Sequence, residues 1–390
     1  IDWNEYGHAF VSNCVNPHLF HVIQGAHYEP DRNRPTGRFA YDRIPTIADH
    51  LHFTNMKTIR AGIGTPEEDT VGGGHAHSGT MVYLGDNWPV KYRGDVFMNN
   101  IHGRRINHDR LSRNGSGYTA SHAPDVMRAA DPWFVGVTLA YGPDGGVFVS
   151  DFSETGECHH RHNTRKQTGR IYKITYGKPK PWRGDIGKLS SVELAKLQSH
   201  PNEWFVRHAR RVLQERANST LGQAAIQSEL NRLLASSSDT IERLRSLWLL
   251  HGIGELTAKR LAELLRDPDE HLRAWAIQLL CENKRPSGAV LDEFLRLAKS
   301  DESPVIRLYL ASAMQRLPLA KRVPVLTALL ARAEDATDPN LPLMYWYATE
   351  PVVAADNKAA VQLLAACKLP KVRQFITRRM ATGRSEFEAK

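Results

Sequence analysis

The spacing of hydrophobic residues changes near residue 180. Before it, short apolar runs are interrupted by Gly, Asn, Asp and aromatic residues, a pattern typical of strands joined by tight turns. After it, apolar residues recur every three or four positions, as on the buried face of a helix. Residues 1–180 contain five leucines and 21 glycines, whereas residues 181–390 contain 34 leucines and seven glycines. Because leucine favours helices, the pattern predicts a β region followed by an α region.

Three strand-rich segments are predicted in the first half, at residues 7–23, 79–108 and 135–174. The last one contains the sequence GPDGG at 142–146, in which Pro fixes φ and Gly accepts a positive φ, as a hairpin turn requires. Apolar runs that end in Asn or Asp at this spacing are typical of four-stranded propeller blades. We therefore predict that residues 1–178 form the last blades of a β-propeller. A β-sandwich is the alternative.

Residues 199–385 are predicted to form an α-solenoid of HEAT-like repeats, after a Pro- and Gly-containing linker at 179–198. A hydrophobic residue followed by an arginine recurs in this half, and a degenerate fifth copy lies at Leu343-Met344. The four clear copies end in Arg207, Arg245, Arg273 and Arg307. We expect each arginine to bond an acid or a carbonyl of the neighbouring repeat, and the curved face of the solenoid to bind a partner.

Charge and cysteine content narrow the possible functions. The net charge is +9, and +7 of it lies in residues 181–390, which hold 31 Lys+Arg against 24 Asp+Glu. The basic residues are scattered at helical spacing instead of forming a block, which argues for a solvated face and against nucleic acid as a partner. The four cysteines form no C-x-x-C pair, which excludes a zinc ribbon and a covalent haem site in this chain. A disulfide between Cys14 and Cys158 is conceivable.

The first residues do not look like the start of a protein. The chain begins Ile1-Asp2-Trp3-Asn4, without an initiator methionine or a signal segment, and no run of 18 apolar residues could cross a membrane. A partial propeller would also leave strand edges unpaired. We therefore expect a fragment of a longer protein, with further blades before Ile1.

Two groups of polar residues in the β half are candidates for chemistry. His75-Ala76-His77 follows three glycines, and its two imidazoles suit either a metal or a general base that accepts a hydroxyl proton. His102, Arg104 and Arg105 follow a predicted strand, where an arginine fork could hold a carboxylate or an anionic cofactor. The structural alternatives are histidines satisfied by backbone carbonyls and arginines that tie neighbouring blades together.

A third group is rich in potential metal ligands but has no clear metal preference. Asp151, Cys158 and His159 are the candidate ligands, since carboxylates favour Ca²⁺ while Cys and His favour Zn²⁺ or Cu. Asp151 follows an apolar strand, and capping of a turn by its side chain is the alternative. Trp88, together with Trp133 and Trp182, could stack on a sugar, although aromatic core packing is the simpler interpretation.

Several long motifs resemble one family. They are GGHAHSGTM at 73–81, GDNWP at 85–89, NIHGRRIN at 100–107, GPDGGV at 142–147, SDFSETGECH at 150–159 and SHPNEWFVRHARR at 199–211. They resemble the "membrane-bound dehydrogenase domain" proteins of planctomycetes and verrucomicrobia, in which a propeller distantly similar to quinone-dependent glucose and sorbosone dehydrogenases precedes HEAT repeats. Full-length relatives carry earlier blades, and many end in a cytochrome c module. Neither is present in this chain.

The resemblance implies an exported, periplasmic or cell-surface dehydrogenase that oxidises sugars or polyols with pyrroloquinoline quinone and Ca²⁺. On this hypothesis His75 or His77 is the base, Arg104 and Arg105 position an anion, and Asp151 touches the metal. The solenoid would dock a cytochrome c-type electron acceptor or other proteins. The alternative is a non-catalytic scaffold that binds glycans through the propeller and proteins through the solenoid. A basic solenoid that contacts nucleic acid is a third, weaker hypothesis.

Overall fold

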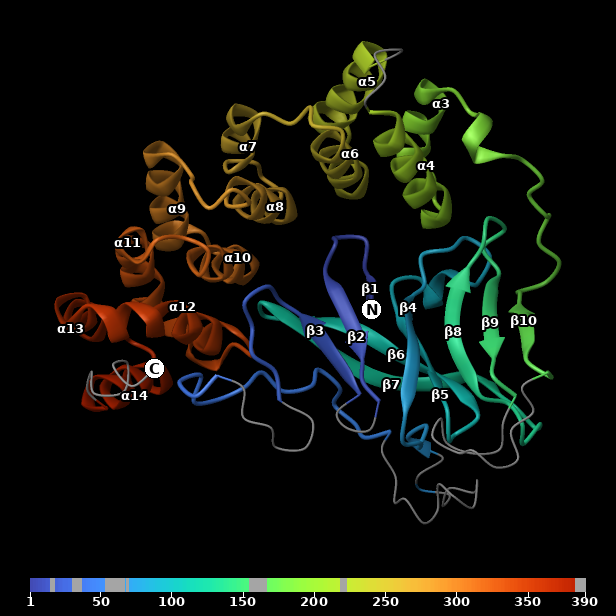
Figure 1. Ribbon diagram of the computed structural model, residues 1–390, viewed down its shortest axis with the longest axis horizontal. Coiled ribbons are helices and arrows are strands. Elements are labelled where there is room, and N and C mark those ends of the chain that lie inside the picture. Colours follow the sequence, from blue (N-terminus) through green and yellow to red (C-terminus); the bar gives the residue numbers. More distant parts are fainter. Residues whose placement is uncertain are drawn as a thin grey trace. The chain divides into compact units, whose positions relative to one another are not determined.

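The β region consists of three antiparallel sheets (Figure 1). The computed structural model describes residues 1–14, 18–29, 37–52, 67, 70–153, 167–217 and 223–382. The first sheet has the order β1-β2-β3, the second β4-β5-β6-β7 and the third β8-β9-β10. Their bounds are β1 Asp2–Trp3, β2 Ala9–Ser12, β3 Leu19–Val22, β4 His77–Val82, β5 Val96–Asn100, β6 Arg105–Asn114, β7 Gly117–Arg128, β8 Gly136–Tyr141, β9 Val147–Asp151 and β10 Arg170–Ile174.

The structure confirms the predicted β region, but its sheets do not all have the four strands that propeller blades require. Two of the sheets have three strands instead of four, and among the described residues the sheets do not close into a propeller. The hairpin turn at 142–146 is present, with Gly145 at a φ of 73° and Gly142 N–H bonded to the Gly146 carbonyl at 2.9 Å. It joins β8 to β9, whose register runs from Gly136 opposite Asp151 to Tyr141 opposite Val147.

The second half is helical, as predicted. Its helices are α3 Ser191–Lys196, α4 Glu203–Arg216, α5 Gln223–Ser236, α6 Thr240–Gly252, α7 Ala258–Leu264, α8 Glu270–Leu280, α9 Gly288–Ser300, α10 Pro304–Met314, α11 Leu319–Leu330, α12 Leu341–Ala355, α13 Asn357–Ala366 and α14 Pro370–Ala381. Short polar side chains begin many of them: Asp269 caps α8, and Ser303 caps α10 with Pro304 in the first turn. No described helix has both the length and the apolar character that crossing a membrane requires.

Contacts divide the chain into two compact units that do not follow chain order. The first unit contains residues 1–22, 46–112 and 119–255, and the second contains residues 23–45, 113–118 and 256–390. Within the first unit, buried Asn202 caps α4 and its amide donates to Asp86 Oδ1 at 2.9 Å and to the Gly142 carbonyl at 3.1 Å. The start of α4 is thereby attached to the sheet loops. The predicted domain boundaries at 178 and 198 stay a prediction.

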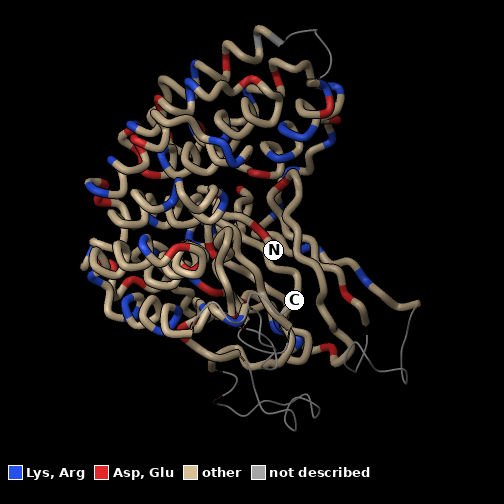
Figure 2. Tube along the Cα trace, turned by 60° about the vertical axis from the view of Figure 1, so that its left-hand side comes forward, with Lys and Arg blue, Asp and Glu red and all other residues tan. Residues whose placement is uncertain are grey.

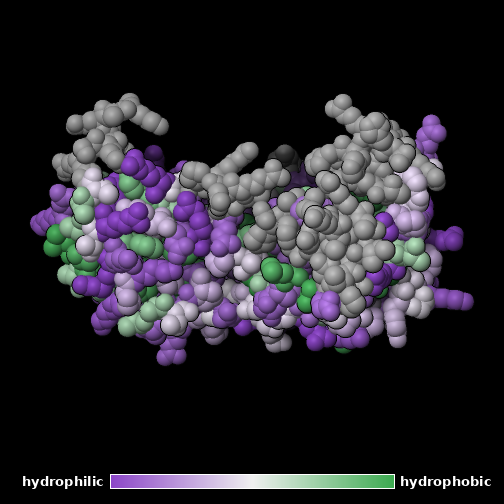
Figure 3. Space-filling view, turned by 90° about the horizontal axis from the view of Figure 1, so that it is seen from below, coloured by the Kyte–Doolittle hydropathy of each residue, from purple (hydrophilic) through white to green (hydrophobic). Residues whose placement is uncertain are grey.

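Three of the four repeated arginines bond neighbouring repeats, as expected, whereas Arg207 donates to Asp2 Oδ1 at 2.8 Å and to the Trp3 carbonyl at 3.2 Å. Arg307 on α10 binds both carboxylate oxygens of Asp335, at 2.6 and 2.8 Å, and donates to the Asp301 carbonyl. Arg273 on α8 pairs with Asp301, and Arg245 on α6 pairs with Glu203. Lys and Arg are interspersed with Asp and Glu over the helical half (Figure 2), in keeping with the scattered basic residues of the sequence. Where Figure 3 is not grey, hydrophilic side chains dominate and hydrophobic ones form small separate groups.

Candidate functional site

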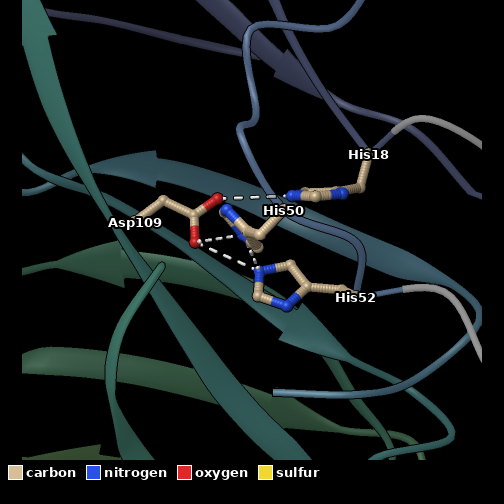
Figure 4. Close-up of side chains that lie close together, drawn as sticks. All are labelled: His18, His50, His52 and Asp109. Carbon is tan, nitrogen blue, oxygen red and sulfur yellow. Dashed lines mark hydrogen bonds and ion pairs between the residues drawn. The ribbon is translucent and has the colours of Figure 1, made fainter. Parts of the chain in front are cut away.

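Three histidines surround one buried carboxylate in the first unit. His52 Nε2 lies 3.1 Å and His50 Nε2 lies 3.3 Å from Asp109 Oδ1, while His18 Nε2 lies 3.4 Å from Asp109 Oδ2 (Figure 4). The two nitrogens of His50 and His52 are 3.0 Å apart. One potential ligand atom from each of the four residues lies within 4.8 Å of all the others. A single metal ion could therefore reach all four.

The four side chains come from three separate segments. His18 directly precedes β3, His50 and His52 lie in the segment before residue 53, and Asp109 lies in β6. This second segment is placed by a bridge between Ala48 and Ala120 of β7 and by the Asp49 N–H, which donates to the Ala120 carbonyl at 3.0 Å. Because side chains alternate along a strand, Asp109 faces the histidines whereas His108 faces away and bonds Asp95 at 2.8 Å.

In two of the histidines, the ring nitrogen that points away from Asp109 contacts another oxygen of the protein. His52 Nδ1 lies 2.5 Å from the Val71 carbonyl oxygen, which can only accept, so Nδ1 carries the proton and Nε2 presents a lone pair in the neutral ring. His50 Nδ1 lies 2.8 Å from Asp49 Oδ1, and Asp49 also accepts a bond from the Ser121 hydroxyl. Histidines that bind metals are usually held in this way, by a carbonyl or carboxylate on the nitrogen away from the metal.

Charge at the centre favours a cation between the four groups. Burial alone would raise the pKa of the Asp109 carboxyl, but the surrounding imidazoles hold it well below its usual range. Burial lowers the pKa of His18 to about 4, so its ring is neutral at pH 7. Burial would also lower the pKa of His50, but its contact with Asp109 raises it overall. A metal requires an ionised carboxylate and imidazole lone pairs. Asp109 and His18 meet this requirement, whereas His50, whose pKa is raised, holds its proton more firmly and must release it to bind a metal.

Two more histidines border the centre. The ring centroid of His77 lies 5.1 Å from that of His18 and 5.3 Å from that of His52, and burial lowers the pKa of His77 well below its usual value. His122 Nδ1 is 3.9 Å from Asp109 Oδ1. His77 is the first residue of β4 and His122 lies in β7, so two further strands of the sheet that carries Asp109 on β6 contribute.

The glycines at 72–74 allow side chains, not a ligand, to approach the backbone. The amides of Asn100 and Asn107 both donate to the Gly72 carbonyl, at 2.9 and 3.0 Å. Gly72 has a φ of 66°, and a Cβ there would lie 2.8 Å from His122 Cε1 and 3.1 Å from His52 Cε1. The glycine-rich loop thus packs directly against the histidine cluster.

The described contacts place the histidines and arginines predicted from the sequence among different neighbours. His75 and His102 meet, with ring centroids 5.4 Å apart and nearly perpendicular planes. Arg105 is buried and bonds Asp125 of the adjacent strand β7 at 3.0 Å and the Gly103 carbonyl at 3.2 Å, so these bonds lie within one sheet and do not join neighbouring blades. Arg104 has a φ of 50° and is not among these contacts. His77 alone joins the Asp109 cluster.

Trp88 is largely a core residue. It is buried, stacks on Tyr83 with centroids 4.7 Å apart, and donates its indole N–H to the Ile174 carbonyl at 3.2 Å. It also lines one side of a cavity of about 570 Å³, together with Glu5, Arg93 and His200.

Asp151 caps a turn, as the alternative interpretation held. Its Oδ1 accepts the N–H groups of Val135 and Ser153 at 2.8 and 2.9 Å, and its Oδ2 accepts from Arg170 at 2.7 Å. Cys158 and His159 lie outside the described residues, and so does one end of the conceivable Cys14–Cys158 disulfide. In the part of the chain that the structure describes, the group able to hold a metal does not include Asp151.

Comparison with known proteins divides the chain in the same way as its hydrophobic pattern. Residues 1–178 match the family described as "Domain of unknown function (DUF7133)". Residues 257–338 match HEAT repeats. The chain therefore contains a DUF7133 domain followed by HEAT repeats. Stacked repeats of this kind offer extended surfaces that bind proteins or peptides.

Solved structures add only distant similarities. A designed armadillo repeat protein in complex with the peptide (KR)4 is 16% identical, with a TM-score of 0.32, over 49% of this chain and 100% of that chain. An engineered protein is 18% identical, with a TM-score of 0.33, over 50% of this chain and 98% of that one. A comparison with proteins of curated function found no match.

The sequence analysis missed His18, His50, His52 and Asp109. One signal was available, because His50-Leu51-His52 has the same spacing as His75-Ala76-His77 and follows an acidic residue, Asp49. Nothing local marks His18 or Asp109, which join the other two only through the sheet.

Proposed function

We propose that the N-terminal β region binds one divalent transition-metal ion through His18, His50, His52 and Asp109. The observation that supports this is the convergence of three imidazole nitrogens on a single buried carboxylate. Three imidazoles and one carboxylate form the nitrogen-rich donor set that suits Zn²⁺ and neighbouring first-row ions. Ca²⁺, which prefers six to eight oxygen ligands, fits these residues poorly.

The burial of the ligands favours a structural role for this ion. The side chains of His52 and Asp109 are fully buried, and those of His18 and His50 are only 3% and 9% exposed. Structural zinc sites have four protein ligands and no open position, as in this arrangement. The ion would hold the segment before β3, the 46–52 segment and β6 together.

The test is the metal content of the purified chain, residues 1–390, after exchange into Zn²⁺, Co²⁺ or Ca²⁺. We expect one Zn²⁺ or Co²⁺ ion per chain and no Ca²⁺ at this site. Asp109→Asn, which keeps the size of the side chain, should lose the ion, and Co²⁺ should give the absorption of a four-coordinate site in the wild type only.

His208→Ala is the matched control, because His208 is an exposed histidine on α4. Its metal content should equal that of the wild type. A folded wild-type chain that retains neither Zn²⁺ nor Co²⁺ would contradict the proposal.

A second candidate is the quinone-dependent oxidation of a sugar or polyol, carried out outside the cytoplasm with a cytochrome c-type acceptor. It is supported by the resemblance of the sequence motifs to the "membrane-bound dehydrogenase domain" proteins. The contact between His75 and His102, two of the predicted site residues, also supports it. Pyrroloquinoline quinone and Ca²⁺ would be its cofactors. Dye reduction by the chain loaded with both should disappear in His75→Ala, and absence of turnover on any sugar or polyol would favour the non-catalytic scaffold.

A further inference from the structure

A groove of about 760 Å³ lies between α7 and α9 of the helical unit. We call it the α7–α9 groove. All of its lining residues fall between 258 and 293, where the structure describes every residue, and all belong to the second compact unit. Figure 1 shows α7, α8 and α9 following one another along the solenoid. The volume is in the range of pockets that take up ligands, about 300–1,000 Å³.

Short elements and small side chains explain why the groove is open. α7 has only seven residues, whereas α9 has 13. Ala258 and Ala262 of α7 and Ala289 of α9 line the groove, so methyl groups stand where larger side chains would fill the space. Helices α9 and α11 pack against each other, but α7 and α9, both described in full, lack comparable packing. Side chains of a partner could therefore enter between them.

The buried side chains that line the groove are apolar. Leu265 is fully buried, and Leu280 of α8 and Val290 of α9 are each 7% exposed. Ala258 and Ala289 are exposed at the sides. A ligand that placed apolar side chains against these residues would remove apolar surface from water, which favours binding.

The acids of the groove are already neutralised by arginines of the chain. Glu293 pairs with Arg266 at 3.2 Å and with Arg296 at 2.6 Å. Burial would raise the pKa of Glu293, but its bonds to these two arginines lower it overall. Glu263 pairs with Arg260 at 3.1 Å. The groove therefore presents little uncompensated negative charge.

Lys259 and Arg285 give the groove an uncompensated positive charge. Both side chains are exposed and line it, and neither forms an ion pair with an acid in the part of the chain that the structure describes. Lys259 lies in the first turn of α7, and Arg285 precedes α9. The first turn of α9 has no acidic residue to offset the positive end of its dipole. Electrostatic complementarity favours a negatively charged ligand here.

We propose that the α7–α9 groove binds an acidic segment of a partner protein. Its apolar side chains would contact Leu280 and Val290, and its carboxylates would pair with Lys259 and Arg285. Nucleic acid matches the charge less completely, because the lining residues, all of them described, include no aromatic side chain on which a base could stack. The proposal uses none of the metal ligands and does not depend on the metal centre.

The experiment selects binders to the chain of residues 1–390 from a random library of peptides displayed on phage. We expect the enriched peptides to combine Asp or Glu with Leu, Ile or Val, and synthetic copies to bind the wild type. The double variant Lys259→Glu with Arg285→Glu should bind them at least about tenfold more weakly, because like charges then face each other. Ala289→Trp, which fills the groove, should weaken binding as well.

Lys299→Glu is the matched control. Lys299 is an exposed lysine in the last turn of α9 and lies outside the lining residues, so this variant makes the same change of charge away from the groove. Its affinity for the peptides should equal that of the wild type, and circular dichroism of the helices checks that every variant is folded.

Reversal of charge on both sides separates complementarity from a loss of structure. Peptides in which Lys replaces each acid should bind the double variant more tightly than they bind the wild type. Should the double variant not fold, the single variant Arg285→Glu, changed at an exposed position outside the helices, gives the same comparison.

Three results would overturn the proposal. The first is enrichment of peptides without acids, or of none that bind the wild type better than Ala289→Trp. The second is acidic peptides whose affinity the groove variants leave unchanged. The third is a single-stranded oligonucleotide that binds more tightly than the peptides and loses affinity in the same variants.

Discussion

Gly72 connects the backbone to the candidate metal centre. Its positive φ excludes most side chains, and its missing Cβ leaves room for His52, His122 and the amide of Asn107. Gly25, Gly79, Gly115 and Gly145 also combine a positive φ with close neighbours. Gly94 also has a positive φ, 87°, but a Cβ there would meet nothing within 4 Å. Alanine substitutions at the two glycines therefore separate the free-energy cost of the left-handed conformation from that of steric crowding.

We expect Gly94→Ala to lower the free energy of unfolding by about 1–2 kcal/mol, the cost of a left-handed alanine. Gly72→Ala should cost about 1–3 kcal/mol more, because crowding of a packed site adds to the same backbone term. Urea denaturation of the two variants measures the difference. Only Gly72→Ala should also reduce the metal content. Equal losses of stability would show that the loop can move away from the histidines.

Both carboxylate oxygens of Asp151 accept hydrogen bonds from the protein. Asp151→Ala leaves the buried N–H groups of Val135 and Ser153 without their acceptor, and we expect a loss of about 2–4 kcal/mol in the free energy of unfolding. Asp131→Asn is the control: Asp131 binds the same Arg170 but is 39% exposed, so this variant should lose much less stability than Asp151→Ala. Metal content should be unchanged in both variants, and a loss of metal in Asp151→Ala alone would restore Asp151 as a ligand.

At the scale of elements, buried ion pairs join successive helices of the solenoid. Arg307 and Asp335 are 5% and 2% exposed, and Tyr345 donates its hydroxyl to the same carboxylate at 2.6 Å. Apolar stripes explain why the helices stack, whereas these pairs fix which part of one repeat meets the next. A hydrophobic residue followed by an arginine was enough to predict them, because a charge inside an apolar stripe must find a partner.

Arg307→Ala should destabilise the helical unit by about 3–5 kcal/mol, because Asp335 would remain buried without its cation. Arg266→Ala is the matched control, since Arg266 pairs with Glu293 but is 73% exposed, and it should lose much less stability than Arg307→Ala. Thermal unfolding followed by circular dichroism of the helices compares them. Similar transition temperatures would mean that the buried pair contributes little to the repeat interface.

At the scale of the whole molecule, the candidate metal ion connects parts of the chain that are far apart in sequence. His18 and Asp109 are separated by 91 residues, and His50 and His52 lie between them. A ligand that binds only the folded state stabilises it by mass action, by about 2.7 kcal/mol at a free concentration 100 times the dissociation constant. Removal of the ion should therefore loosen these segments selectively.

A chelator should speed hydrogen exchange in residues 46–52 and in β6, and added Zn²⁺ should reverse the change. Exchange in α12 and α14 should be unaffected, because these helices contribute no ligand. Mass spectrometry of peptides from the exchanged chain gives both regions in one experiment. No change in the first two regions would indicate that the four side chains pack stably without a metal.

Local pattern predicted most of the elements but only part of the site. The predicted strands at 135–140 and 147–151 and the helices around Arg273 and Arg307 are present, because alternation, turn residues and caps act over a few neighbouring residues. The strand β7 was missed, since its polar sequence GYTASHAPDVMR shows no clear alternation. His75 and His77 looked like one motif, yet they point to different neighbours, His102 and His18.

The sequence by itself determined that a β region with most of the histidines precedes a leucine-rich helical solenoid with arginines between its repeats. The reason is that period, turn chemistry and burial of apolar stripes are local properties. Only the tertiary structure decided which histidines meet Asp109, that Trp88 stacks on Tyr83 and Arg105 pairs with Asp125, and that Phe39 and Asp42 accept hydrogen bonds from α12. Such contacts depend on how distant segments pack, and no spacing along the chain records them.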